Sequence, residues 1–244
     1  MKRLYSVLNY KNLHLYQDDE WFCFSLDSVI LGNFSTIKLG TKNIAELGTG
    51  NAIVSLILSQ RTKAHIDAIE IQQDVAELAL ENVKYNKLEN QISVINEDMK
   101  VFCSNHNNYD KYDMVVCNPP YFKVIDNRSV NLDVHKAIAR HEIKVNISEV
   151  IASAWSILKE GGIFSMVYGV ERFCEILFLF SKQRFEVKYI RFIHDRINLE
   201  PCLFYIEATK LGRPGLKIDK PFILRNEDES FTDEYLKIQN GVIK

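Results

Sequence analysis

The chain has 244 residues, of which 47% are hydrophobic and 25% charged, and its formal net charge at pH 7 is −2. These values are typical of one globular domain with modest additions, and the sequence contains no low-complexity tract or internal repeat. The near-neutral balance excludes a general basic field for nucleic acid, although it allows a local basic patch.

The cysteines and the apolar runs bear on compartment and membrane. The five cysteines are scattered and form no Cys-x-x-Cys pair: Cys23, Cys103, Cys117, Cys174 and Cys202. Reduced thiols in a cytoplasmic protein are therefore favoured over a disulfide or a zinc site. The first residues lack the apolar core of a signal peptide, and the apolar run at 176–180 is too short to span a bilayer.

The first predicted elements are short. We expect strands at 13–16 and 21–24 to pair as a hairpin, followed by a helix over 29–34. Ser25 or Asp27 is placed to cap this helix. Capping is the default role of Asp27, with contact to a bound ligand as the alternative.

Residues 43–58 have the pattern of a buried strand, a glycine turn and a helix. Gly48 and Gly50 let the backbone turn tightly and approach a ligand closely. A nicotinamide-binding loop would have a third glycine at the position of Ile53, and a phosphate-binding loop would have Gly-Lys-Ser/Thr, which is absent. From the two glycines alone, an ordinary strand–turn–helix connection is the better interpretation.

Acidic residues follow the next two predicted strands. The strand at 65–70 ends in Glu70, where doubly wound folds place a carboxylate that accepts both hydroxyls of a ribose. A helix is predicted over 73–87 and another strand over 91–95. Asp98 comes just after that strand. Acceptance from an adenine amino group and a plain surface turn are equally good interpretations of it.

The apolar strand predicted at 112–117 leads directly into Asn118-Pro119-Pro120-Tyr121. Neither proline has an N–H to donate, so the strand must stop there in a stiff bend. The Asn118 side-chain oxygen and the Pro119 carbonyl can hold an exocyclic amine while it attacks an electrophile. Tyr121 can stack on the planar group that carries the amine. For an isolated motif of this kind, a turn that only ends a strand is an equally good interpretation.

Residues 122–139 have no clear period, and we predict a loop over this edge of the sheet. A capping box at 146–149 opens a helix that is predicted to run through Leu158 and to end at Gly161-Gly162. The remaining predicted elements are a strand, a helix and two terminal strands, at residues 163–168, 170–180, 185–193 and 202–209.

The alternation of strands and helices predicts an α/β fold. We expect a Rossmann-like, doubly wound, mostly parallel seven-stranded sheet with a C-terminal antiparallel strand pair. The carboxyl ends of its strands should bring four features to one edge: Glu46-Leu47-Gly48-Thr49-Gly50, Glu70, Asp98 and Asn118-Pro119-Pro120-Tyr121.

In this order and spacing, the sequence resembles the class I S-adenosylmethionine-dependent methyltransferases over roughly residues 25–210. More narrowly, it resembles the bacterial tRNA1(Val) adenine-37 N6-methyltransferase family, through residues 24–28, 69–72, 117–122 and 139–142. That family methylates the adenine beside the anticodon of a valine tRNA. One departure is Ala52, where relatives commonly carry glycine, and it makes the loop somewhat stiffer.

The resemblance implies S-adenosyl-L-methionine as the cofactor and assigns residues to it. Glu70 would bind the ribose, Asp98 the adenine, and the glycine turn would pass beneath the methionine part. The full expected donor-binding set is Asp27, Glu46, Gly48, Gly50, Asn51, Glu70, Ile71, Asp98, Met99 and Asn118. The expected catalytic residues are Asn118, Pro119, Pro120 and Tyr121, and the expected RNA-binding residues are Tyr121, Phe122, Lys123, Arg128, Arg140 and His141.

The implied organisation has an N-terminal lead-in over 1–40, a donor-binding methyltransferase domain over 41–210 and a C-terminal extension over 211–244. The expected partner is the anticodon stem-loop of a tRNA, with neither a membrane nor a metal. The oligomeric state is left open.

Several rival functions share these motifs. A glutamine N5-methyltransferase acting on release factors also uses the NPPY motif, but usually carries a helical domain where residues 1–45 have a strand-like pattern. An adenine N6-methyltransferase for DNA or ribosomal RNA is a second rival, and little chain is left for the recognition domain that a DNA enzyme needs. A non-catalytic donor-binding subunit is a third. An oxidoreductase is disfavoured by Ile53.

Overall fold

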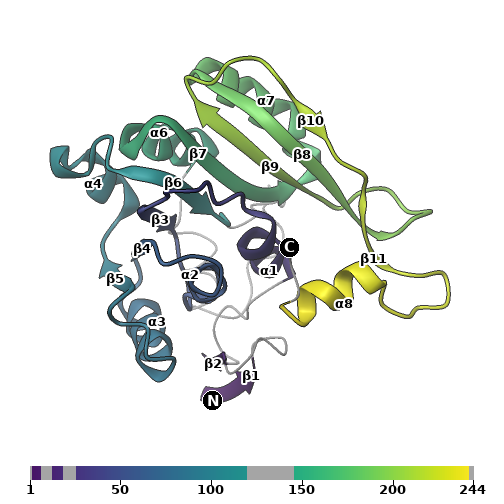
Figure 1. Ribbon diagram of the computed structural model, residues 1–244, viewed down its shortest axis with the longest axis horizontal. Coiled ribbons are helices and arrows are strands. Elements are labelled where there is room, and N and C mark those ends of the chain that lie inside the picture. Colours follow the sequence, from purple (N-terminus) through teal and green to yellow (C-terminus); the bar gives the residue numbers. More distant parts are fainter. Residues whose placement is uncertain (1, 7–12, 19–25, 120–145, 242–244) are drawn as a thin grey trace, which may run out of the picture.

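The computed structural model describes four stretches of the chain, drawn in colour in Figure 1: residues 2–6, 13–18, 26–119 and 146–241. Within these stretches the centre of the molecule is one sheet of nine strands. Its strands are β3 (Asn43–Leu47), β4 (His65–Glu70), β5 (Ile92–Asn96), β6 (Tyr112–Cys117), β7 (Leu158–Gly169), β8 (Phe185–Arg196), β9 (Leu203–Lys210), β10 (Lys217–Ile218) and β11 (Phe222–Arg225).

The strand order is β10-β8-β9-β7-β6-β3-β4-β5, and β11 also pairs with β8. Strands β3, β4, β5, β6 and β7 pair with one another in parallel, whereas β9 runs antiparallel to both β7 and β8. This confirms the predicted doubly wound, mostly parallel sheet with a terminal antiparallel pair. The two strands beyond the expected seven are β10 and β11, which extend the sheet by pairing parallel with β8.

Helices cover both faces of the sheet (Figure 1). One layer contains α1 (Leu26–Phe34), α2 (Ile53–Ser59) and α3 (Gln73–Tyr85), and the other contains α4 (Met99–Ser104), α6 (Ile147–Ile157) and α7 (Phe173–Lys182). The remaining described helices are α8 (Asp233–Gln239) and two single 3-10 turns, η1 (His106–Asn108) and η2 (Val170–Arg172).

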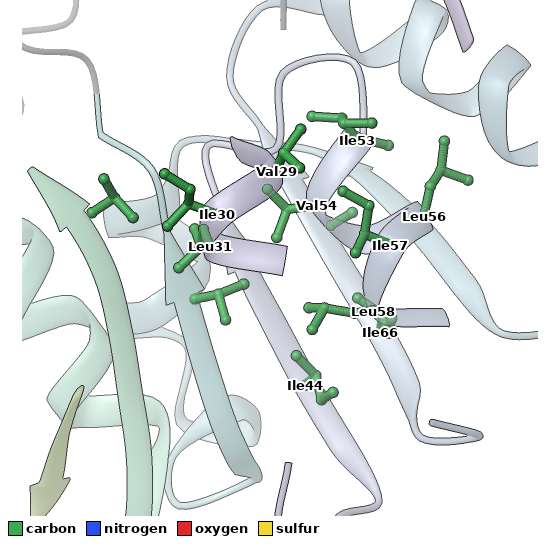
Figure 2. Packing of buried hydrophobic residues seen from close by; sticks show 14 of the residues in the cluster. Val29, Ile30, Leu31, Ile44, Ile53, Val54, Leu56, Ile57, Leu58 and Ile66 are labelled. Atoms are coloured by element: carbon green, nitrogen blue, oxygen red, sulfur yellow. The ribbon is translucent and has the colours of Figure 1, made fainter. Parts of the chain in front are cut away.

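Successive side chains of a strand point to opposite faces of the sheet, so each helix layer packs against a different set of strand residues. In β6, Met114 and Val116 face the α1–α2 layer, whereas Val115 and Cys117 face the α4–α6–α7 layer. Figure 2 shows the first of these cores, in which apolar side chains of α1 and α2 meet Ile44 of β3 and Ile66 of β4. Strands buried on both faces are usually nearly continuous apolar runs, as the second half of β6 is, whereas the buried strand β4 also contains His65, Asp67 and Glu70; both strands have the bounds predicted from the sequence.

Two local predictions are wrong. The helix opened by the capping box of Asn146 ends at Ile157, and β7 begins at once with the buried Leu158. The glycine pair therefore lies inside β7, where the pairing with β6 shifts register between Tyr112 and Met114. A Cβ on Gly162 would lie 2.9 Å from the backbone carbonyl oxygen of Lys159, so this position requires a residue without a side chain.

The second correction concerns the N-terminal segment, where a further prediction is not tested. Strand β2 (His14–Asp18) pairs antiparallel with β1 (Lys2–Ser6), and the predicted partner at 21–24 lies outside the described residues. Helix α1 begins at Leu26, so Asp27 lies in its first turn and not at its cap. Ser25, the other predicted cap, lies outside the described residues.

The described residues contain neither a membrane-spanning helix nor a cluster of metal-binding side chains. None of the described helices combines the length and the apolarity needed to cross a bilayer. Their histidine, cysteine, aspartate and glutamate side chains form no group of three or more that could hold a metal ion. All four described cysteines are free: Cys103 and Cys117 are buried, as expected, whereas Cys174 and Cys202 are exposed.

Candidate active site

The turn between β3 and α2 is held against the end of β4. Gly48 and Gly50 have φ values of 71° and 57°, in the left-handed region that favours glycine. The backbone N–H groups of Gly48 and Thr49 both donate to the Ile69 carbonyl, at 2.9 Å each. Among the described residues, a Cβ built on Gly50 would meet nothing within 4 Å, and one on Gly48 only Met99 Cε at 3.8 Å. The described part of the chain therefore leaves this side of the turn open.

Glu70 ends β4 and faces this turn. Its Oε2 accepts from the Gly50 N–H at 2.9 Å and its Oε1 from the Gln72 N–H at 3.0 Å, so the carboxylate is fixed from both sides. Only 5% of the residue is exposed, and burial raises the pKa of its carboxyl. Each carboxylate oxygen has a second lone pair, so the group keeps acceptor capacity for two ligand hydroxyls.

The next strand end brings Asp98 and Met99 to the same edge. Asp98 is the N-cap of α4, and its Oδ1 accepts from the Lys100 N–H at 2.7 Å. Its side chain is half-buried, so the carboxylate that caps the helix could also accept a hydrogen bond from a ligand. The exposed Ile71 directly follows Glu70, and Met99 approaches the glycine turn. These two side chains offer apolar contact to a flat ring beside the carboxylates.

Asn118 lies one residue beyond β6, whose last residue pairs with the last residue of β3. This register puts Asn118 level with Gly48. The Asn118 Nδ2 donates to Ser28 Oγ of α1 at 3.0 Å, which fixes the orientation of the amide. Asn118 is half-buried and Pro119 is buried. The other expected base-holding and RNA-binding residues lie outside the described part of the chain: Pro120, Tyr121, Phe122, Lys123, Arg128, Arg140 and His141.

Comparison with known proteins decides what kind of enzyme this edge belongs to. The model of the methyltransferase small domain family matches residues 28–182, which is more than half of the chain. The chain belongs to this family. It is an S-adenosylmethionine-dependent methyltransferase.

Two curated relatives are matched over most of their length. A tRNA1(Val) (adenine(37)-N6)-methyltransferase of Bacteroides fragilis is 31% identical, covering 87% of this chain and 86% of that one. A protein of the same name from Tolumonas auensis is 26% identical, covering 94% and 93%. Among solved structures, a predicted O-methyltransferase of Agrobacterium tumefaciens superposes with a TM-score of 0.71 at 21% identity, covering 89% of this chain and 97% of that one. It supports the fold.

The residues around the turn fit the donor of this methyltransferase. The carboxylate of Glu70, the open backbone of the glycine turn and the apolar pair Ile71 and Met99 match a ribose, a polar chain and a flat base. Asn51 adds a further observation. Its Nδ2 is buried and has no hydrogen-bond partner among the described residues, which is rare for a buried donor unless a ligand completes it.

Glu46 lies beneath the turn of the methyltransferase. It is 2% exposed, and its Oε2 accepts from both the N–H and the hydroxyl of Ser55, the N–H at 2.9 Å. It therefore holds the first turn of α2, and thereby the loop above it. Burial raises the pKa of Glu46 to about 7, against the opposing effect of the Ser55 hydrogen bonds.

This buried carboxyl predicts a pH dependence of stability. With a pKa of about 7 when folded and 4.5 when exposed, ionised Glu46 weakens folding by about 3 kcal/mol. The contribution of the neutral form is complete below pH 4.5 and is lost as the pH rises to about 7. Urea unfolding of wild type and Glu46→Gln across this window checks it, because glutamine cannot ionise. A difference between the two proteins that does not change with pH contradicts the prediction.

Sequence reasoning missed two contributors to this edge. Ser28 orients Asn118, and the sequence contained a signal for it, because Ser28 is part of the stretch at 24–28 that carries the family resemblance. Asn82 of α3 reaches the carbonyl of Asn51 at 3.0 Å. It lies on the apolar face of α3, among Leu78, Ala79 and Val83, so a polar residue at this position was a signal that the sequence contained.

Proposed function

We propose that this methyltransferase modifies N6 of adenine 37 in tRNA1(Val), within the anticodon stem-loop. The observation that carries the proposal is Asn118, held by Ser28 beside the glycine turn, in a chain that aligns over most of its length with relatives of that name. An amide at this place is suited to an exocyclic amine, because its oxygen accepts an amino hydrogen.

S-adenosyl-L-methionine supplies a methyl group on a positively charged sulfur. The task of the protein is to bring a poorly nucleophilic amine to it, since the lone pair of that amine is delocalised into the adenine ring. The base leaves its stack and enters the site. Asn118 and the Pro119 carbonyl accept the amino hydrogens, which holds the nitrogen in place and stabilises its growing positive charge. The extra proton leaves to water, and positioning provides most of the acceleration.

The donor is held, in this proposal, by Glu70 at the ribose, Asp98, Ile71 and Met99 around the adenine, and the glycine turn beneath the methionine part. Residues 41–210 form the donor-binding domain, with 1–40 and 211–244 as additions. Tyr121 stacks on the target base, and the RNA contacts lie in the segment from Phe122 to His141. The enzyme acts in the cytoplasm.

The test is methyl transfer from labelled donor to total tRNA that lacks the modification, followed by nucleoside analysis. We expect N6-methyladenosine in a single valine isoacceptor. Label that appears only in protein would establish the glutamine N5-methyltransferase rival. Donor binding without transfer to any RNA would establish the non-catalytic one.

A further inference from the structure

Asn82 of α3 and Asn86, the C-cap residue of that helix, hold the N-terminal strand β2 on the core. Asn86 Oδ1 accepts from the His14 N–H at 3.0 Å, and its Nδ2 donates to the His14 carbonyl at 2.7 Å. Asn82 Oδ1 accepts from the Tyr16 N–H at 2.6 Å, and its Nδ2 donates to the Tyr16 carbonyl at 3.0 Å. His14 and Tyr16 are two residues apart, so their N–H and carbonyl groups lie on the same edge of the strand. Each asparagine amide pairs with both groups of one residue.

Only Asn82 also touches the turn that faces the donor. Its Nδ2 donates a second hydrogen bond, at 3.0 Å, to the Asn51 carbonyl, and its side chain is fully buried. The three bonds use both amide hydrogens and the oxygen of Asn82. Asn86 makes the same kind of contact with β2, and its Nδ2 also donates to the Asn82 carbonyl in the last turn of α3.

The carbonyl that Asn82 holds belongs to the peptide between Asn51 and Ala52. Ala52 has a φ of 69°, in the left-handed region that a residue with a Cβ adopts only when its surroundings impose it. The direction of this carbonyl is set by the same peptide plane that fixes φ of Ala52. A hydrogen bond that fixes the carbonyl therefore opposes relaxation of Ala52 to an ordinary conformation.

We propose that Asn82 is a positioning residue for the donor: it holds the strained Asn51–Ala52 peptide and joins the N-terminal hairpin to the donor-binding turn. Glu70 holds the same turn from the other side, through the Gly50 N–H. The turn is thus fixed at its Thr49–Gly50 peptide by a carboxylate from β4 and at its Asn51–Ala52 peptide by an amide from α3. This inference rests on the donor site proposed above, and it does not depend on which RNA is methylated.

The test is calorimetric titration of the full chain with S-adenosylhomocysteine, which needs no RNA. Asn82→Ala is expected to bind about five- to tenfold more weakly, the effect of losing one buried hydrogen bond. Asn86→Ala is the matched control, because it loses the same pairing with β2 and leaves the Asn51 carbonyl alone. Its affinity is expected to stay within about twofold of wild type. Equal weakening by both variants overturns the proposal, since docking of β2 would then explain it.

A second substitution tests the strain itself. Glycine adopts the left-handed region without penalty, so Ala52→Gly is expected to restore most of the affinity lost in Asn82→Ala and to change nothing in Asn86→Ala. Failure of this rescue overturns the role of strain at Ala52. Should Asn82→Ala unfold, Asn82→Asp against Asn86→Asp gives the same comparison at nearly constant volume.

A further variant separates this inference from the donor site on which it rests. If Glu70→Ala leaves the affinity for S-adenosylhomocysteine unchanged, the proposed donor site is wrong. If Glu70→Ala weakens binding and Asn82→Ala does not, the site stands and only the role of Asn82 is overturned.

Discussion

Asn118→Ala is expected to lower the rate of methyl transfer by about 100- to 1,000-fold, the usual effect of removing one group that stabilises developing charge. The amide is half-buried and its orientation is set by the bond from Nδ2 to Ser28 Oγ. Alanine removes the acceptor that holds the target amine, whereas the donor-binding turn itself is built from other residues. Asn118 also belongs to the expected donor-binding set, so we expect the affinity for S-adenosylhomocysteine to fall, but by less than about tenfold, well below the loss in rate.

The measurement is single-turnover methylation of transcribed valine tRNA at saturating donor, with two graded variants beside it. In Asn118→Asp the Ser28 hydroxyl can donate to one carboxylate oxygen, and the other oxygen can still accept from the target amine. This variant should therefore retain more activity than Asn118→Ala. Ser28→Ala removes only the group that orients the amide, and we expect a loss of about three- to tenfold. A wild-type rate for Asn118→Ala would exclude Asn118 as the amine acceptor.

The layout of this edge could be predicted from the sequence because it follows from strand ends. Strand β4 ends in the carboxylate Glu70, and strand β6 runs directly into Asn118 and a proline pair. The predicted bounds of both strands match the structure. Parallel strands must then bring Glu70 and Asn118 to one edge of the sheet. The bond from the Gly50 N–H to Glu70 confirms that this carboxylate faces the glycine turn.

What could not be predicted depends on contacts between elements distant in the chain. The family resemblance puts Glu46 in the expected donor-binding set, but nothing in the sequence indicated that its carboxylate accepts from Ser55 in the first turn of α2. Asn82 and Asn86 follow the apolar face of the predicted helix, and only the structure reveals their partners on β2 and the bond of Asn82 to the Asn51 carbonyl. The strands β10 and β11 have two and four residues, too few for any periodic signal.

Glu70→Ala is expected to weaken binding of S-adenosylhomocysteine by about 100-fold, because two hydrogen bonds to a charged acceptor are lost at about 1.5 kcal/mol or more each. The Gly50 N–H also loses its partner, so the turn loosens as well. Glu70→Gln is the matched variant: it keeps one acceptor oxygen and the side-chain volume, and should bind about tenfold more weakly than wild type. If Glu70→Ala binds S-adenosylhomocysteine as tightly as wild type, Glu70 is not the residue that binds the ribose.

The same carboxylate predicts how binding depends on pH. Burial raises the pKa of Glu70 above its ordinary value, and the ionised form is the one that accepts two hydroxyls. Affinity for the donor is therefore complete above the raised pKa and falls as the pH drops through it, at a higher pH than for an exposed glutamate. Glu70→Gln has no carboxyl at this position and should lose this part of the pH dependence. Titrations of both proteins across mildly acidic pH measure the difference, and parallel curves would assign the dependence to another group.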